Sequence, residues 1–202
     1  NLMTSYPILC RRDLGNQFST MLRPTAKDWF HVARRYVEEE DNETKQVLQK
    51  FEEIQRRAMY DPEAMFSRAT KEGDHDFAAF GQCVISTELA NNYRSGQHLL
   101  YRCWHLKDVA WQENEYGRIG SVFRKWKPTA QQLHRTFGDK VDDKVKKLLE
   151  KTPFEEIETM HMVVEADMYD DNTNKPYWSI WWDVTHAVLI EAVPSWTCVY
   201  TI

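Results

Sequence analysis

The sequence predicts an α+β fold in which N-terminal helices are followed by a mainly antiparallel sheet with short helical excursions. Helical periodicity dominates residues 1–81, whereas alternating apolar and polar residues with turn signals dominate residues 82–202. No linker rich in Pro, Gly or Ser and no internal repeat separates the two parts, so we expect a single α+β region. With 202 residues, of which 42% are apolar, the chain can bury a substantial core.

The helical part opens with an amphipathic stretch at Arg12–Leu22, which Pro24 ends. Apolar residues share one face of this stretch: Leu14, Phe18, Met21 and Leu22. The next apolar run, Asp28–Val32, is typical of a short strand.

The strongest helical pattern spans Asp41–Met59, where Asp or Asn can cap the N-terminus. The spacing of Glu52 to Arg56, and of Glu53 to Arg57, predicts two ion pairs along this helix. One apolar stripe recurs at helical spacing: Val47, Phe51, Ile54 and Ala58.

A further helix is expected to start at Asp61-Pro62, because Asp is a good N-cap and Pro fits the first helical position. Its apolar stripe starts at Phe66, and Gly81 can cap its end. Gly73 lies on that stripe, although glycine costs about 1 kcal/mol of helix propensity relative to alanine. We therefore expect either a close approach of another backbone at Gly73 or a break in the helix.

The second part of the chain contains strand patterns and two short helical patterns. Two strands are predicted at Cys83–Leu89 and Leu99–Trp104, separated by the polar turn Asn91–Gly96, and a hairpin is predicted from Val109–Gln112 with Arg118–Trp126. The late strands are Ile157–Glu165, Tyr177–Asp183 and Ala187–Ala192. The short helices are Pro128–Phe137, closed by Gly138, and Asp142–Glu150.

Charge and composition exclude several classes of protein. A net charge of −5 and a pI near 5.8 argue against tight, charge-driven DNA binding by the whole chain. Only 7 glycines argue against a glycine-rich nucleotide-binding loop. No apolar run approaches the roughly 20 residues that a membrane span requires, and no signal-peptide pattern is present. The chain starts with Asn1 instead of Met, which suggests that it begins inside a longer polypeptide.

The patterns typical of catalytic and metal sites are not found. The sequence has no HExxH, GxSxG or CxxC motif. Asp74-His75-Asp76 lies in a helical pattern where neighbouring side chains diverge, and the loop at residues 170–181 departs from the calcium-binding pattern. We therefore predict no catalytic residue, no cofactor and no metal. We expect the four cysteines to be reduced, mostly buried thiols of an intracellular product: Cys10, Cys83, Cys103 and Cys198.

Two weaker patterns suggest alternative functions. Basic and aromatic side chains alternate near the predicted hairpin, which suits contact with a nucleic-acid backbone and base stacking: Arg118, Arg124, Lys125, Trp126 and Lys127. An α+β nucleic-acid-binding module is therefore one alternative. Glu113 and Glu115 share a strand face and could act as paired carboxylates of a small intracellular hydrolase, although an exposed turn explains them better.

Large rings gather in one late strand, where Trp178, Trp181 and Trp182 occupy both faces. Either both faces are buried in the core, or one face packs against a partner subunit. A small-ligand site is the least favoured interpretation, because no convergent polar groups accompany the rings. These three tryptophans are our candidate subunit-interface residues.

Residues 113–132, with the sequence ENEYGRIGSVFRKWKPTAQQ, resemble the head-to-tail connector, or portal, family of short-tailed bacteriophages. That family has an ENEYGR-type turn, a VFR strand and a K-x-T-A-x-Q helix start that runs to a Phe-Gly, here Phe137-Gly138. The resemblance extends from Leu14 to Trp196. Its flanking motifs, in order, are Trp29-Phe30, the Val47–Ala58 helix, Phe77–Gly81, Leu99–Cys103, His161, Lys175–Tyr177 and, more weakly, Pro194 with Trp196.

The sequence also departs from the family pattern. Family members are much longer and contain stem helices, a clip and a crown, so this chain resembles the wing region of a portal only. The Arg of the family's PRW motif is absent here. Functions of the clip, such as docking of the packaging motor, are therefore not implied for this chain.

The resemblance implies a structural role without catalysis. Portal subunits form a twelve-membered ring at one capsid vertex, through which double-stranded DNA is packaged and ejected without sequence-specific binding. The implied partners are copies of the chain, together with capsid, scaffolding and tail adaptor proteins, and no membrane. The implied location is the portal vertex of the virion, after synthesis in the host cytoplasm. An acidic balance suits this role, because a moving duplex should not be gripped.

Overall fold

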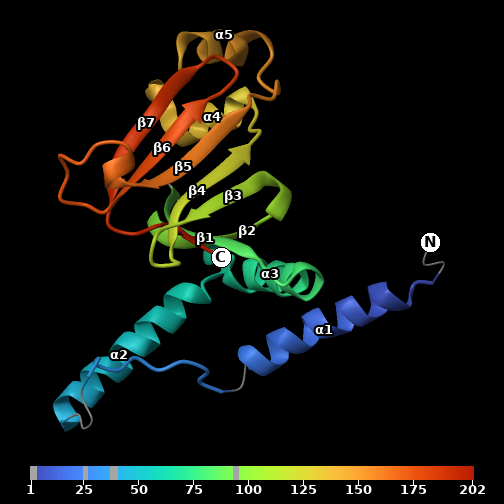
Figure 1. Ribbon diagram of the computed structural model, residues 1–202, viewed down its shortest axis with the longest axis vertical. Helices are drawn as coiled ribbons and strands as arrows, with labels where there is room; N and C mark the ends of the chain where they lie inside the picture. Colours follow the sequence, from blue (N-terminus) through green and yellow to red (C-terminus); the bar gives the residue numbers. More distant parts are fainter. Residues whose placement is uncertain (1–3, 25–26, 37–40, 93–95) are drawn as a thin grey trace. The chain divides into compact units, whose positions relative to one another are not determined.

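The computed structural model describes residues 4–24, 27–36, 41–92 and 96–202 (Figure 1). It confirms the α+β class, since helices come first and antiparallel sheets follow. The chain divides into two compact units, of which the first comprises residues 1–104 and 200–202 and the second comprises residues 105–199. The expected change from helices to strands near residue 82 falls inside the first unit.

Helices form the first part of the first unit. Among the described residues, these are α1 (Tyr6–Leu22), α2 (Asn42–Met59) and α3 (Phe66–Phe80), with a 3₁₀ turn, η1 (Pro62–Ala64), before α3. Helix α1 begins before its predicted start, because Pro7 fits the first turn of a helix and extends it toward the N-terminus. It ends before Pro24, as predicted.

The predicted start of α3 at Pro62 is wrong. Asp61 does act as a cap, since its Oδ1 accepts a hydrogen bond of 2.8 Å from the backbone N–H of Glu63, but only η1 follows. Met65 then adopts a left-handed conformation with φ of 56°, which interrupts the helix before Phe66. Gly81 ends α3, as predicted.

Helix α1 packs closely on α3 at Gly15. A Cβ atom at Gly15 would lie 2.9 Å from Cε1 of His75 and closer still to its Nδ1, so a side chain at this position collides with the imidazole. Arg23, just after α1, forms a largely buried ion pair with Asp74 of α3. A steric fit and an ion pair together hold α1 on α3.

The sheet of the first unit has the order β2-β1-β8 in the described residues, and all its pairs are antiparallel. Its strands are β1 (Val84–Asn92), β2 (Gly96–Trp104) and β8 (Tyr200–Thr201). The two predicted strands are confirmed as β1 and β2, which pair antiparallel, while residues 93–95 of the predicted turn lie outside the described residues. Both predicted explanations of Gly73, a close approach of another backbone and a break in the helix, are wrong. Helix α3 continues through Gly73, and a side chain makes the close approach, since a Cβ atom there would lie 3.1 Å from Cδ1 of Ile85.

The second unit, which the structure describes throughout, contains a five-stranded antiparallel meander with the order β3-β4-β5-β6-β7 (Figure 1). Its strands are β3 (Val109–Glu113), β4 (Ile119–Trp126), β5 (Thr159–Glu165), β6 (Tyr177–Asp183) and β7 (Val188–Ser195). The predicted strands of this region are therefore confirmed, with small shifts at their ends. Three short 3₁₀ turns accompany these strands: η2 (Leu106–Asp108) precedes β3, η3 (Gly138–Lys140) lies in the connection between β4 and β5, and η4 (Ala166–Met168) follows β5.

Two short helices, α4 (Ala130–Phe137) and α5 (Asp143–Lys151), connect β4 to β5 and close the core of this unit. A complete capping box starts α4: Thr129 Oγ1 accepts from the N–H of Gln132, and the Gln132 side chain accepts from the N–H of Thr129. The core combines residues of both helices with residues of the sheet: Ala130, Leu133, Phe137, Val141, Val145, Ile157 and Ile190, with Trp126, Leu148 and Trp181 packed against them.

A row of polar and aromatic side chains crosses the five-stranded sheet. Strand register places Arg124, His161 and Trp181 side by side. Arg124 is 1% exposed, and its guanidinium carbon lies 5.8 Å from the ring centre of Trp126 and 5.2 Å from that of Trp181. The His161 ring stacks on Trp181 at 4.0 Å, and its Nε2 lies 2.8 Å from Oγ of Ser179. Burial and, secondarily, the Arg124 charge lower the pKa of His161 to about 3.

Gly15→Ala should lower the free energy of unfolding by about 1–3 kcal/mol, because overpacking against His75 outweighs the better helix propensity of alanine. Urea unfolding measures this loss. In the double variant with His75→Ala, the penalty of Gly15→Ala should largely disappear. If the penalty is the same with and without the imidazole, the proposed close fit of α1 on α3 is wrong.

His161 should make the fold sensitive to acid. Below pH 6.5 the unfolded chain protonates this histidine, whereas the folded chain does not until the pH approaches 3. Stability is therefore complete above the unfolded pKa and falls as the pH drops, by about 3 kcal/mol between pH 7 and pH 4. Urea unfolding at a series of pH values should show that His161→Gln removes this slope, whereas His105→Gln, at an exposed position, retains it. Parallel stability curves for the wild-type chain and His161→Gln would contradict the assignment.

Candidate functional site

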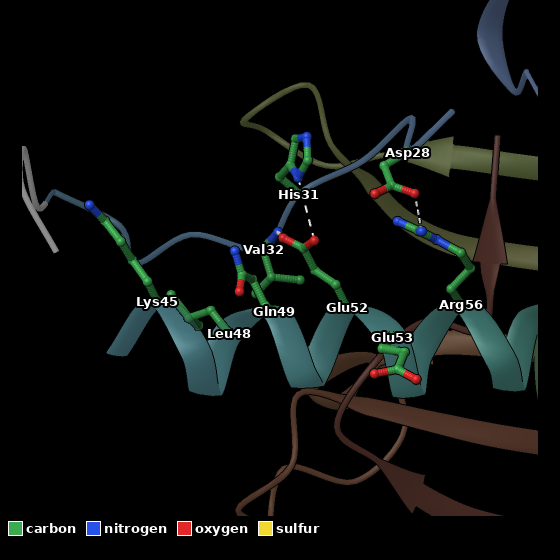
Figure 2. Close-up of a pocket in the computed structure, with 9 residues that line it drawn as sticks. All are labelled: Asp28, His31, Val32, Lys45, Leu48, Gln49, Glu52, Glu53 and Arg56. Atoms are coloured by element: carbon green, nitrogen blue, oxygen red, sulfur yellow. Dashed lines mark hydrogen bonds and ion pairs between the residues drawn. The ribbon is translucent and has the colours of Figure 1, made fainter. Parts of the chain in front are cut away.

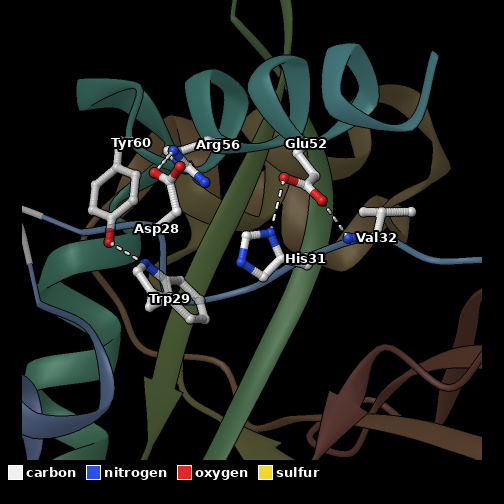
Figure 3. Close-up of polar contacts among 7 residues, drawn as sticks. All are labelled: Asp28, Trp29, His31, Val32, Glu52, Arg56 and Tyr60. Atoms are coloured by element: carbon white, nitrogen blue, oxygen red, sulfur yellow. Dashed lines mark hydrogen bonds and ion pairs between the residues drawn. The ribbon is translucent and has the colours of Figure 1, made fainter. Parts of the chain in front are cut away.

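The segment at residues 28–32 lies along α2 and is not the strand that the sequence predicts (Figure 3). Its backbone bonds to a side chain instead of to another strand, since Glu52 Oε1 accepts a hydrogen bond of 2.6 Å from the N–H of Val32. The other carboxylate oxygen of Glu52 lies 3.4 Å from Nδ1 of His31. One glutamate of α2 therefore holds two neighbouring residues of this segment.

Two further contacts extend this attachment along the same face of α2 (Figure 3). Arg56 forms an ion pair with Asp28, and the indole N–H of Trp29 donates to the hydroxyl of Tyr60 at 3.1 Å. Arg56 and Tyr60 follow Glu52 at intervals of four residues, so all three side chains lie on one helical face. We call Glu52, Arg56 and Tyr60 the polar clamp.

The clamp changes one of the predicted ion pairs. Glu52 and Arg56 each bind the 28–32 segment, and they do not pair with each other as the spacing predicted. The second predicted pair is present, with Arg57 Nη2 at 2.9 Å from Glu53 Oε1. Glu52 and Arg56 therefore contact residues of the 28–32 segment, whereas Glu53 and Arg57 keep their local pair.

A cavity of about 450 Å³ lies between this segment and α2 (Figure 2). Its lining is mixed in charge: Asp28, His31, Val32, Lys45, Leu48, Gln49, Glu52, Glu53 and Arg56. The acid–base pairs at its wall are contacts within the chain, and within the described ranges no cluster of three or more His, Cys, Asp or Glu side chains could hold a metal ion. The arrangement attaches one segment to a helix and offers no evident acid–base chemistry.

The opposite face of α2 is apolar and exposed. Val47, Phe51 and Ile54 are 54%, 57% and 52% exposed, and the 3.6-residue period places them on the other side of the helix from the polar clamp. The predicted stripe therefore exists, but it does not enter the core of its own unit. We call these three residues the α2 stripe.

The predicted apolar face of α1 is also largely exposed, at Leu14, Met21 and Leu22. Such contiguous apolar helix faces are unusual on monomeric proteins and typical of contact surfaces. The helical period predicted that these residues share one face, but it does not say which partner covers that face.

The candidate interface tryptophans are divided between the two faces of β6. Trp181 belongs to the core of its own unit, with ring centres 5.1 Å from Phe137 and 5.6 Å from Trp126. Strand alternation places Trp178 and Trp182 on the opposite face, where both are half-buried. Trp178 also makes contacts inside its own unit, since its indole N–H donates to the carbonyl of Asp170 at 2.9 Å and its ring centre lies 5.1 Å from that of Tyr169. A role of Trp178 and Trp182 in subunit contact stays a prediction.

The candidate nucleic-acid residues are not presented together. Arg124 is buried beside Trp181, so its guanidinium cannot serve as an exposed phosphate contact. Trp126 is half-buried against the same core. Arg118, Lys125 and Lys127 are exposed, and their contact with nucleic acid stays a prediction.

The hydrolase alternative gains no support from local geometry. Glu113 ends β3 at a register shift, Glu115 follows in the turn, and both side chains are exposed. The prediction that the cysteines are mostly buried is wrong, since Cys10 is exposed and the other three are only half-buried. Partial burial raises the pKa of Cys83, and it raises the pKa of Cys103 to about 12 with help from the nearby Asp76 carboxylate. Thiols with raised pKa values are poor nucleophiles at neutral pH.

Comparison with known proteins points to one family. The profile of the family described as bacteriophage head to tail connecting protein matches residues 1–192. No curated protein matches the chain. In the part of the chain that the structure describes, no helix has both the length and the apolar character needed to span a membrane.

Glu52→Ala should release the 28–32 segment from α2. The N–H of Val32 loses a charged acceptor, a contact worth about 1.5–3 kcal/mol, so its amide should exchange with solvent more than tenfold faster. Hydrogen exchange at Val32 measures this change. The matched control is Glu53→Ala, which removes an exposed pair worth about 0.5 kcal/mol or less and should leave the exchange at Val32 unchanged. Equal exchange rates in the two variants would show that the clamp does not hold the segment.

Proposed function

Because the chain belongs to the bacteriophage head-to-tail connecting protein family, a family of structural proteins, we propose that it acts as one subunit of a closed ring that joins the phage head to the tail. In this proposal the ring surrounds the path of the double-stranded DNA during packaging and ejection. The subunit acts by assembly with its own copies and with capsid, scaffolding and tail proteins. It works at the portal vertex of the virion.

The observation that carries this proposal is the α2 stripe. Three large apolar side chains lie more than half exposed at helical spacing, while the chain fastens the polar face of the same helix to itself. Covering such a stripe releases about 25 cal/mol for each Å² of apolar surface removed from water. A subunit that assembles gains this free energy only in the assembly, which is the behaviour expected of a ring component.

A ring made of one kind of subunit requires two unlike contact surfaces on each copy. The first unit offers the α2 stripe. In the second unit, Trp178 and Trp182 lie on the sheet face opposite Trp181, which packs on the core beneath α4 and α5. The chain therefore carries large apolar side chains on two different elements, as heterologous contact requires.

The charge balance is consistent with a passage for DNA. A net charge of −5 gives the duplex no overall attraction to the subunit, and Arg124 is buried. A duplex that must move in both directions benefits from a weakly interacting wall.

Mass photometry and electron microscopy of the purified chain over a range of concentrations test this proposal. The wild-type chain is expected to form a uniform closed ring. Phe51→Glu should raise the concentration needed for assembly by about tenfold or more, as for a central interface side chain, because it places a charge in the α2 stripe.

Phe154→Glu supplies the matched control, since Phe154 is an exposed phenylalanine outside the stripe. It should assemble like the wild-type chain. A wild-type chain that stays monomeric at every concentration would contradict the ring, and equal assembly of Phe51→Glu and Phe154→Glu would remove the stripe from the contact.

A further inference from the structure

Helices α1 and α3 enclose a groove whose lining is mainly apolar. A cavity of about 220 Å³ lies between these helices and the start of β1. Four large apolar side chains line it: Phe18 and Leu22 of α1, Phe77 of α3 and Ile85 of β1. The rings of Phe18 and Phe77 meet edge to face, with their centres 5.5 Å apart. We call the cavity lined by these four side chains and by Gly73 the α1–α3 groove.

The groove is deep at Gly73 and open to solvent. Gly73 belongs to the lining and contributes no side chain to it. A Cβ atom at this position would lie 3.5 Å from Sγ of Cys83, which places the floor of the groove close to the glycine. Leu22 and Phe77 are 57% and 47% exposed, so a side chain from outside can enter between two apolar walls.

The charges at the wall of the groove neutralise each other. Arg23 and Asp74 both line it, and they form an ion pair whose side chains are only 17% and 9% exposed. A charged occupant would lose its hydration here, where the two charges at the wall already pair with each other. By contrast, several charged side chains line the cavity beside α2 and also a cavity of about 290 Å³ beside β2. The α1–α3 groove therefore selects an apolar occupant.

The size of the groove suits one aromatic ring with a neighbouring aliphatic side chain. A protein cavity of about 150 Å³ holds a benzene molecule, and this groove is larger. In the α2 stripe, Phe51 supplies the ring, and Val47 and Ile54 lie about one helical turn before and after it. Apolar side chains at this spacing are the anchors with which a helix binds a hydrophobic groove.

The stripe and the groove do not meet within one copy. All three side chains of the stripe are more than half exposed, and Leu22 and Phe77 of the groove are exposed as well. Each copy therefore presents both an apolar ridge and an apolar hollow. We propose that the α2 stripe of one copy packs into the α1–α3 groove of a neighbouring copy, with the ring of Phe51 beside Gly73.

This inference rests on the proposed ring function and gives the α2 stripe a counterpart. The ridge and the hollow are different surfaces of the same chain, so their contact is heterologous. Such a contact propagates from copy to copy and can close into a ring. It does not require the tryptophans of β6, which remain available for a separate contact.

Photo-crosslinking of the full chain tests the proposal. In one variant the photoreactive residue p-benzoylphenylalanine replaces Ile54, which leaves Phe51 in place. This variant is assembled together with isotope-labelled wild-type chain and irradiated, and mass spectrometry identifies the joined peptides. Crosslinks should connect position 54 of the variant to α1, α3 or the start of β1 of a labelled copy.

The outcomes separate this inference from the ring itself. An assembly in which position 54 crosslinks to other segments, or to none, would overturn the inference and leave the ring standing. Absence of any assembly in the wild-type chain would overturn the ring and the inference together.

Leu22→Glu tests the same contact from the groove, because it places a charge between the apolar walls. It should raise the concentration needed for assembly by about tenfold or more. Met21→Glu is the matched control, since Met21 is the adjacent residue of α1, is 76% exposed and lies outside the lining of the groove. It should assemble like the wild-type chain.

Thr70→Lys introduces a charge from the α3 side of the groove and is decisive if Leu22→Glu does not fold, as circular dichroism shows. Assembly of Leu22→Glu, or of Thr70→Lys in its place, at the wild-type concentration would contradict the proposed contact.

Discussion

The carboxylate of Glu52 accepts a hydrogen bond from the backbone N–H of Val32 and pairs with His31, and this contact attaches residues 28–32 to one face of α2. The segment at residues 28–32 covers the polar face of α2, where it contacts Glu52, Arg56 and Tyr60. The apolar face is then left without a partner in its own unit. Exposure of this apolar face to water is unfavourable for an isolated subunit, and an assembly that covers the face would remove that cost.

The second unit uses its polar groups in the opposite way. Arg124 and His161 lie inside the unit, stacked with Trp181, and burial keeps His161 neutral by lowering its pKa. Arg124, which the sequence pattern assigns to a nucleic-acid-binding surface, is therefore part of the interior of this unit. The buried row ties the three neighbouring strands β4, β5 and β6 together.

Sequence patterns predicted the elements with local signals and missed those decided by distant partners. The capping residue Thr129 and the terminating Gly81 act within one turn of their own helices, so α4 and the end of α3 could be predicted. The 28–32 segment resembles a strand by composition, but its backbone partner, Glu52, lies twenty positions after Val32. Likewise, alternation shows that Arg124 belongs to a strand, but not that a tryptophan from another strand covers it. The α2 stripe was visible in the sequence, although its outward direction was not.

The account predicts that α2 is exposed in the free subunit and covered in the assembly. The most direct measurement is the rate at which a thiol introduced by Ile54→Cys reacts with a maleimide, in dilute chain and in the purified assembly. Peptide mass spectrometry separates this thiol from the exposed native Cys10. The reaction should be fast in dilute chain and at least about tenfold slower in the assembly, as expected for a site that is covered by a partner. Equal rates in the two states would contradict the central claim that copies of this chain meet through the α2 stripe.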